Sequence, residues 1–344
     1  MTVLYQVFVT RQSASMTANG PSLSGQQIPM GTRKWWIEQS CKVSVITAHH
    51  LPKQQLRTKS TYEGCSTISI HLSFQLIGNC VVAQSMLPRP KLNEMIGVNV
   101  GFGLAIAFGV AISAKISGQQ YISYITGGHI NPAVSLMFVS FRQLAPVRFV
   151  LYALVQTAGA FVGAALTYAL YHEAINAFDG GVRTVVGAKA TAEIFASYPA
   201  AHLGLLNGLV DQVIGTAVFC FLIAHVTDKK NSYPTWLQPL LVGLSFVAVG
   251  AAFGYNCGYP CNPARDFGPR LFTFVIGYGG EGSRLSVFRY KSWFWVPIVG
   301  PFIGALIGAW LYQLAIGFHT PHDVEEKYVV LTGNQELKPL TTKE

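Results

Sequence analysis

The sequence predicts an all-α membrane protein, with six transmembrane helices plus two re-entrant half-helices arranged in two inverted repeats. Three observations predict this fold. Only 11% of the 344 residues are charged and 51% are hydrophobic, whereas ~25% of a typical soluble protein is charged. The uncharged residues gather into runs that are long enough to cross a bilayer. The tripeptide Asn-Pro-Ala occurs twice, each time before an apolar stretch that is too short to cross one.

The composition also excludes several classes of protein. The net charge of +9 does not indicate nucleic-acid binding, because the Lys and Arg residues are spread between apolar blocks. The six cysteines contain no Cys-x-x-Cys pair and do not form the pattern of a disulfide scaffold. An enzyme is disfavoured, since no nucleophile–base pair or metal-ligand cluster lies in the predicted spans. We therefore expect no cofactor and no metal.

The six spans follow the runs that lack Asp, Glu, Lys and Arg. A helix needs ~20 apolar residues to cross a ~30 Å hydrocarbon core, and backbone groups in lipid must be paired within their own segment. The predicted spans are 66–87, 95–116, 149–171, 203–227, 236–255 and 293–317. The first is the weakest, because its first half is polar and includes Thr67, His71 and Gln75.

The spans divide the chain into three regions and two repeats. These are an N-terminal arm (1–65), a membrane domain (66–318, with repeats 66–172 and 203–318) and a C-terminal tail (319–344). The arm is polar without periodicity, which predicts disorder. With a cytosolic N-terminus, inside segments hold 15 Lys and Arg residues and outside segments hold seven. This excess predicts that both termini are cytosolic.

Each Asn-Pro-Ala tripeptide is expected to begin a short helix. The two copies are Asn131, Pro132, Ala133 and Asn262, Pro263, Ala264. An Asn side chain caps unpaired amides, and Pro is favoured at the first helical position. The apolar stretch after the first copy ends at Phe141, which is ~15 Å of helix. The second stretch runs towards Phe274.

The order of the segments predicts that these two half-helices meet. Three spans per repeat is an odd number, so the second repeat inserts upside down and the half-helices enter from opposite sides. Their facing N-termini each carry roughly +0.5 elementary charge and oppose cations and protons. The amides of Asn131 and Asn262 can donate hydrogen bonds to a passing oxygen. The pattern favours a neutral hydroxylated or water-like permeant.

At these residues the sequence resembles the major intrinsic protein family, the aquaporins and aquaglyceroporins. The resemblance covers residues 74–318 and is strongest in GHINPAVS at 128–135 and CNPARDFGPRL at 261–271. It implies a pore in each subunit of a homotetramer. Asp266, Arg270, Pro297 and Ile298 match the glycerol-conducting branch. Asp266 and Arg270 are also spaced i, i+4, which favours a structural ion pair.

The resemblance also implies which residues line the pore. The selectivity filter carries over to Phe102, Gly250, Tyr259 and Arg265, and the ladder of pore-facing carbonyls to Gly127, Gly128, His129, Gly258, Tyr259 and Pro260. Gly250 stands where water-specific relatives have His, which widens the constriction. For His129, a role in holding the loop is as plausible as direct contact with the permeant. Asp211 matches a buried acid that is expected to anchor loop amides of the second half-helix.

Two departures from the family pattern bear on function. Thr67 stands where the family has a Glu, and residues 119–127 add nine residues before the first half-helix. Either could mark a poorly conducting splice isoform. Cys257 and Cys261 flank the filter. Two interpretations remain for them: inert buried thiols, or thiols that make the channel sensitive to mercurials or oxidants.

The leading hypothesis is a multi-pass plasma-membrane channel that passes glycerol and water and excludes protons and ions. A channel mainly for water, urea or hydrogen peroxide is the alternative within this class. A secondary transporter also uses broken helices, but such proteins generally need carboxylates near the midplane. Asp211 and Asp266 are the only candidates, and each has a structural interpretation.

Overall fold

The computed structural model describes residues 53–88, 93–116, 129–279 and 286–320, together with two strand pieces at 328–329 and 338–339. Side chains are described for 67–88, 93–113, 129–279 and 286–320. The chain forms two units, Met1–Thr58 and Lys59–Glu344, and the second contains the transmembrane helices after α2 and both half-helices. Residues 1–52 of the predicted arm 1–65 lie outside the described residues, whereas 53–65, which the sequence predicts to be disordered, form part of a helix.

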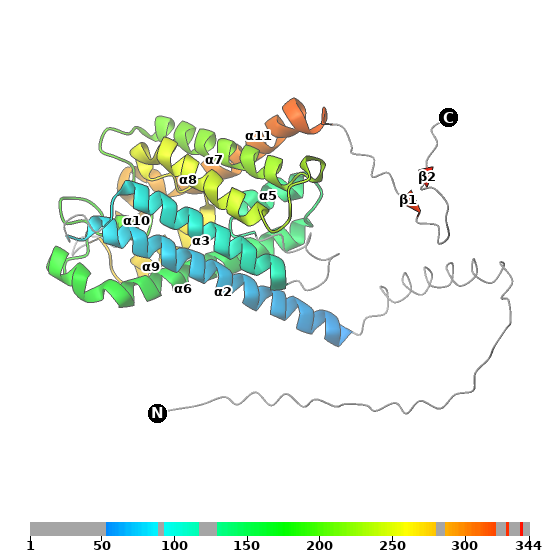
Figure 1. The fold of residues 1–344 in the computed structure, drawn as a ribbon. Coiled ribbons are helices and arrows are strands. Elements are labelled where there is room, and N and C mark those ends of the chain that lie inside the picture. Colours follow the sequence, from blue (N-terminus) through cyan, green and yellow to red (C-terminus); the bar gives the residue numbers. More distant parts are fainter. Residues whose placement is uncertain are drawn as a thin grey trace, which may run out of the picture. The chain divides into compact units, whose positions relative to one another are not determined.

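Within the described residues, five helical segments are long and apolar enough to cross a membrane. They contain α3 (Met95–Ile116), α6 (Pro146–Asp179), α7 (Leu205–Thr227), α8 (Gln238–Cys257) and α11 (Val296–Tyr312) (Figure 1). A further long helix, α2 (Lys53–Met86), covers the predicted first span except for its last residue and is not among these five. The all-helical membrane fold that the sequence predicts is thus confirmed.

The longest difference from the predicted spans is at the start of α2, which begins at Lys53 rather than at residue 66, and the next longest is at the end of α6. The apolar run stops near residue 171, but the helix continues through two further turns to Asp179. Gly180 ends it in the left-handed conformation, with φ 70°, and its N–H bonds to the carbonyl of Asn176. Glycine adopts this conformation at no steric cost. The sequence rule measured only the length of the apolar run, and the helix continues beyond it.

Both half-helices form at the predicted tripeptides. Helix α5 (Pro132–Ser140) has nine residues and α9 (Pro263–Val275) has 13, so they extend only ~14 Å and ~20 Å. Each begins with Pro directly after an Asn N-cap. Neither can cross a ~30 Å core.

Shorter elements lie between and after the long helices. They are η1 (Ala192–Ile194), η2 (Lys229–Asn231), α10 (Ser286–Arg289), η3 (Tyr290–Trp295), the π-helical η4 (Gln313–Gly317), and the antiparallel strands β1 (Tyr328–Val329) and β2 (Lys338–Pro339). The connection between α6 and α7 contains η1. This connection carries several residues of the candidate site.

Close helix pairs hold the bundle together. Helix α3 packs against α8, and α7 packs against α11 (Figure 1). A Cβ atom at Gly243 would overlap the Gly103 carbonyl, and one at Gly308 would overlap the Ala217 carbonyl. Small residues permit such close contact between membrane helices. The same kind of contact therefore holds the pair α3 and α8, which joins the two repeats, and the pair α7 and α11, which lies within the second repeat.

The larger polar side chains of the described part of α2 lie on a face that is buried. His71, Gln75 and Asn79 are fully buried, and the Gln75 amide donates to Asn79 Oδ1 at 2.7 Å. Two glycines of α6 receive this face: a Cβ at Gly159 would lie 3.1 Å from the Cβ of His71, and one at Gly163 would lie 2.9 Å from that of Gln75. His71 and Gln75 therefore lie on a face of α2 that packs against α6.

Candidate functional site

The N-termini of the two half-helices are joined by reciprocal hydrogen bonds. Asn131 Nδ2 donates to the carbonyl of Cys261, and Asn262 Nδ2 donates to the carbonyl of Ile130, both at 2.8 Å. Each Asn side chain therefore reaches across to the loop before the other half-helix. An amide NH2 has two donors, so each Asn keeps a second N–H beyond this bond.

The oxygen of each Asn side chain caps its own helix. Asn131 Oδ1 accepts from the Ala133 amide at 2.8 Å. Asn262 Oδ1 accepts from the amides of Ala264 and Arg265 at 3.1 and 3.2 Å. These bonds satisfy amides that a helix N-terminus otherwise leaves unpaired. The predicted capping role and the meeting of the two helices are both present.

Arg265 lies in the first turn of α9 and is almost completely buried. Its guanidinium carbon lies 5.2 Å from the centre of the Phe102 ring, within the range of a cation–π interaction. Its Nη1 donates to the carbonyl of Phe195 at 3.2 Å. A fixed cation with several hydrogen-bond donors thus stands opposite an aromatic wall.

The other two predicted filter residues lie next to this pair. The rings of Phe102 and Tyr259 meet edge to face with centroids 6.4 Å apart. A Cβ atom at Gly250 would come within 2.7 Å of both Tyr259 Cζ and Asn99 Oδ1. Glycine is therefore the residue that leaves room for the Tyr259 ring. The four filter residues predicted from the sequence are brought together.

Asn99 is a residue of this site that the sequence analysis missed. It is buried, and its Oδ1 accepts a hydrogen bond from the Tyr259 hydroxyl. It precedes Phe102 by three residues in α3, so both lie on one face of the helix. A polar residue one turn from a predicted filter residue, inside an apolar run, was the signal that could have identified it.

Asp266 and Arg270 form a buried ion pair that also holds the α6–α7 connection. Asp266 Oδ1 accepts from Arg270 Nε at 2.8 Å, and Oδ2 accepts from the Ser197 amide at 2.7 Å. Arg270 Nη2 donates to the Ser197 carbonyl at 2.6 Å. Its guanidinium also lies 4.7 Å from the centre of the Tyr198 ring. Burial raises the pKa of Tyr198 to about 12, which keeps this phenol neutral beside the cation.

Comparison with known proteins identifies the family. Residues 67–312 match the family described as Major intrinsic protein. The chain belongs to the major intrinsic protein family. It is 39% identical to aquaporin-9 of Homo sapiens over 291 residues, which cover 83% of this chain and 93% of that protein. It is 43% identical to aquaporin-10 of Milnesium tardigradum over 72% of this chain, but the match spans only 62% of that relative.

A solved structure supports the same fold. The chain resembles the X-ray structure of the aquaglyceroporin from Plasmodium falciparum with a TM-score of 0.63 and 24% identity. The match covers 75% of this chain and 98% of that one. At this identity the likeness shows the fold alone. The family match and the five apolar helices together establish this major intrinsic protein as an integral membrane protein.

The contact expected of Asp211 in this family member belongs to Gln212 instead. Gln212 is buried, and its Oε1 accepts from the Cys261 amide in the loop before α9 at 3.2 Å. Asp211 is only partly buried and accepts from side chains, including Asn256 Nδ2 at 2.8 Å. Adjacent residues of a helix point ~100° apart. The prediction for Asp211 is therefore wrong by one position, because only one of the two faces the loop.

The predicted carbonyl ladder is only partly within the described residues. Gly127, Gly128 and the added residues 119–127 lie outside them. The carbonyl of His129 accepts from Gln156 Nε2 at 2.6 Å, and its ring stacks on Phe138 with centroids 4.5 Å apart. These contacts agree with a residue that holds the loop.

The loop before α9 has an unusual backbone. Gly258, Tyr259 and Cys261 all have positive φ, at 73°, 42° and 46°, and Pro260 lies among them. Left-handed conformations are costly for residues with a side chain and persist where the surroundings fix them. The Gln212 contact to Cys261 and the Asn99 contact to Tyr259 provide such fixation.

The remaining predicted residues lie around this loop. Cys257 and Cys261 are buried free thiols, and Cys257 Sγ donates to Asp211 Oδ2 at 3.3 Å. Pro297 is buried in the first turn of α11, and Ile298 is half-buried beside it. The burial of the two thiols agrees with the inert role considered for them.

Proposed function

We propose that this chain is a passive channel for glycerol and water. The observation that carries the proposal is that the buried Arg265 guanidinium contacts the Phe102 ring and that the Tyr259 ring packs beside both, in space left by the missing side chain of Gly250. A polyol has hydroxyl groups on a carbon skeleton. The guanidinium donates to the hydroxyls, and the rings of Phe102 and Tyr259 contact the skeleton.

The positive charges at the junction oppose the passage of cations and protons. The N-termini of α5 and α9 meet where Asn131 and Asn262 bond to the opposite loops. Each terminus contributes roughly +0.5 elementary charge, and Arg265 adds a full charge nearby. A cation or hydrated proton loses solvation here and meets like charge. A neutral oxygen can instead accept the second N–H of either Asn.

The relatives support the assignment to glycerol and water. One of them, 39% identical over 67% of this chain, is named aquaglyceroporin-2, from Rhizophagus irregularis. The proposal includes a homotetramer in the plasma membrane, in contact with lipid, with both termini cytosolic. It includes neither catalysis nor a cofactor. Outward apolar side chains such as Leu104, Phe108, Leu154 and Leu170 suit contact with lipid or with neighbouring subunits.

Flux through purified protein in vesicles tests this function. Stopped-flow light scattering on proteoliposomes measures water and glycerol permeability against empty vesicles. We expect glycerol flux that rises linearly with the gradient and needs no ion gradient. Tight saturation or dependence on an ion gradient would indicate a transporter instead. Arg265→Ala should lower the glycerol-to-water permeability ratio, because the fixed hydroxyl donor is lost.

A further inference from the structure

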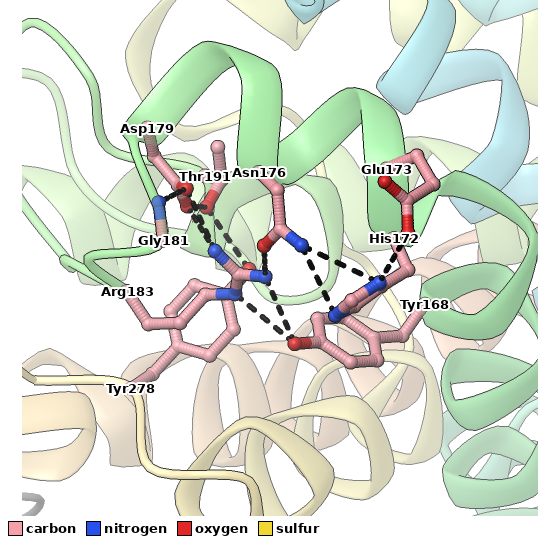
Figure 2. Close-up of polar contacts among 9 residues, drawn as sticks. All are labelled: Tyr168, His172, Glu173, Asn176, Asp179, Gly181, Arg183, Thr191 and Tyr278. Carbon is pink, nitrogen blue, oxygen red and sulfur yellow. Dashed lines mark hydrogen bonds and ion pairs between the residues drawn. The ribbon is translucent and has the colours of Figure 1, made fainter.

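A buried ion pair joins the end of α6 to the connection that follows it. Arg183 Nη1 lies 2.7 Å from both carboxylate oxygens of Asp179, the last residue of α6 (Figure 2). The side chains are 9% and 0% exposed. One nitrogen thus contacts both oxygens, and charge-assisted bonds shielded from water are stronger than those of an exposed pair. The resemblance to the family assigned no role to this pair.

Every nitrogen of the Arg183 guanidinium has a partner. Nε and Nη2 donate to the Tyr168 hydroxyl at 3.2 and 3.0 Å, and Nη2 also donates to Asn176 Oδ1 (Figure 2). On the other side of the carboxylate, the Thr191 hydroxyl donates to Asp179 Oδ2 at 3.3 Å. It also lies 3.0 Å from the Tyr278 hydroxyl. The pair therefore ties the connection to α6 at one end and to the segment after α9 at the other.

The clamped connection leads directly to Arg265. Helix η1 begins one residue after Thr191, and Phe195 follows it. Phe195 is fully buried, with its ring against Tyr278 at a centroid distance of 5.9 Å. Its carbonyl is the group that accepts from Arg265 Nη1. The clamp thus acts four residues upstream of this carbonyl, while the Ser197 contacts to Asp266 and Arg270 act two residues downstream.

Arg265 depends on this carbonyl for its orientation. Within the described part of the chain, its guanidinium forms no ion pair within 4.0 Å. The Phe102 ring attracts the cation but does not fix which nitrogen points where. The Phe195 carbonyl supplies the directional contact. A displacement of the connection moves this acceptor and releases the guanidinium.

We propose that Asp179 and Arg183 are positioning residues for selectivity, which hold the α6–α7 connection so that the Phe195 carbonyl orients Arg265. This inference rests on the proposed function. Glycerol needs donors in fixed places for its hydroxyls, whereas a water molecule adapts to a mobile donor. Loosening the clamp therefore penalises glycerol more than water.

The test measures the glycerol-to-water permeability ratio of proteoliposomes with Asp179→Asn, Arg183→Gln and Thr191→Val. Glu173→Gln and Arg289→Gln are matched controls, because they remove an exposed carboxylate of α6 and an exposed guanidinium. We expect the ratio to fall about threefold or more in Asp179→Asn and Arg183→Gln, because a threefold change is the scale of one ordinary lost hydrogen bond. The ratio should fall less in Thr191→Val. Arg183→Lys should keep part of the wild-type ratio, and the two controls should have the wild-type ratio.

A double-mutant cycle separates positioning from a general structural role. In an Arg265→Ala background, Arg183→Gln should leave the ratio unchanged, because the residue it positions is gone. If Arg183→Gln lowered the glycerol-to-water ratio by the same factor with and without Arg265→Ala, the clamp proposal would be overturned. A wild-type ratio in monodisperse Asp179→Asn and Thr191→Val would overturn it as well. Both results would leave the channel function intact. Absence of glycerol flux in the wild-type chain would overturn both.

Discussion

The hydroxyl of Tyr259 donates a hydrogen bond to Asn99 Oδ1, and this bond joins the loop before the second half-helix to a helix of the first repeat. Both residues are buried. The bond holds the phenol ring edge to face with Phe102 and beside Gly250. One wall of the candidate filter is therefore fixed by a residue outside the filter itself.

Breaking this bond from one side should destabilise the protein. Tyr259→Phe leaves Asn99 Oδ1 buried without its partner, which costs about 1–3 kcal/mol of unfolding free energy. Asn99→Leu strands the phenol hydroxyl in the same way. The double variant removes both polar groups, so its loss should be smaller than the sum of the two. Thermal unfolding of the detergent-solubilised protein measures this, and additive losses would contradict the bond.

Side chains at position 250 should select against glycerol. Gly250→Ala places a Cβ within 2.7 Å of Tyr259 and Asn99, so the ring must shift. Gly250→His fills the constriction further, and we expect a larger fall in the glycerol-to-water ratio. The matched control is Gly254→Ala, whose Cβ would lie 3.4 Å from Tyr259. If Gly250→His left the ratio unchanged, the filter assignment would be wrong.

Gln212 rather than Asp211 should support the loop before α9. Gln212→Leu removes the acceptor of the Cys261 amide and leaves that buried N–H unpaired, at a cost of about 1–3 kcal/mol. Asp211→Asn keeps the oxygen that accepts from Asn256 and should cost much less. Melting temperatures of the two variants compare them directly. If the melting temperature fell more in Asp211→Asn than in Gln212→Leu, Asp211 rather than Gln212 would support the loop, as the sequence analysis expects.

The added residues 119–127 should be dispensable for conduction. They fall on the connection before the first half-helix, which the sequence predicts to be cytosolic. Removing them joins Gly118 to Gly128, and we expect glycerol flux in vesicles to be retained or raised. Loss of flux in a deletion variant that still forms monodisperse protein would show that the insertion takes part in the pore.

Much of the site followed from local chemistry. The charge-free runs gave the long helices, because a charge in lipid is costly. Asn followed by Pro gave the starts of α5 and α9, because capping depends on residues adjacent in the chain. The sequence also showed that the first span is polar, but it did not predict which face of that helix packs against α6.

The sequence by itself determined where the two half-helices begin, that they are too short to cross, and which family motifs they carry. Only the tertiary structure decided that Gln212 faces the loop, that Asn99 holds Tyr259, and that Asp179 and Arg183 act on the connection reaching Arg265. The physical reason is distance along the chain. Capping and membrane length are local properties, whereas these bonds join groups 49 to 160 positions apart or depend on how a connection folds back over the half-helix.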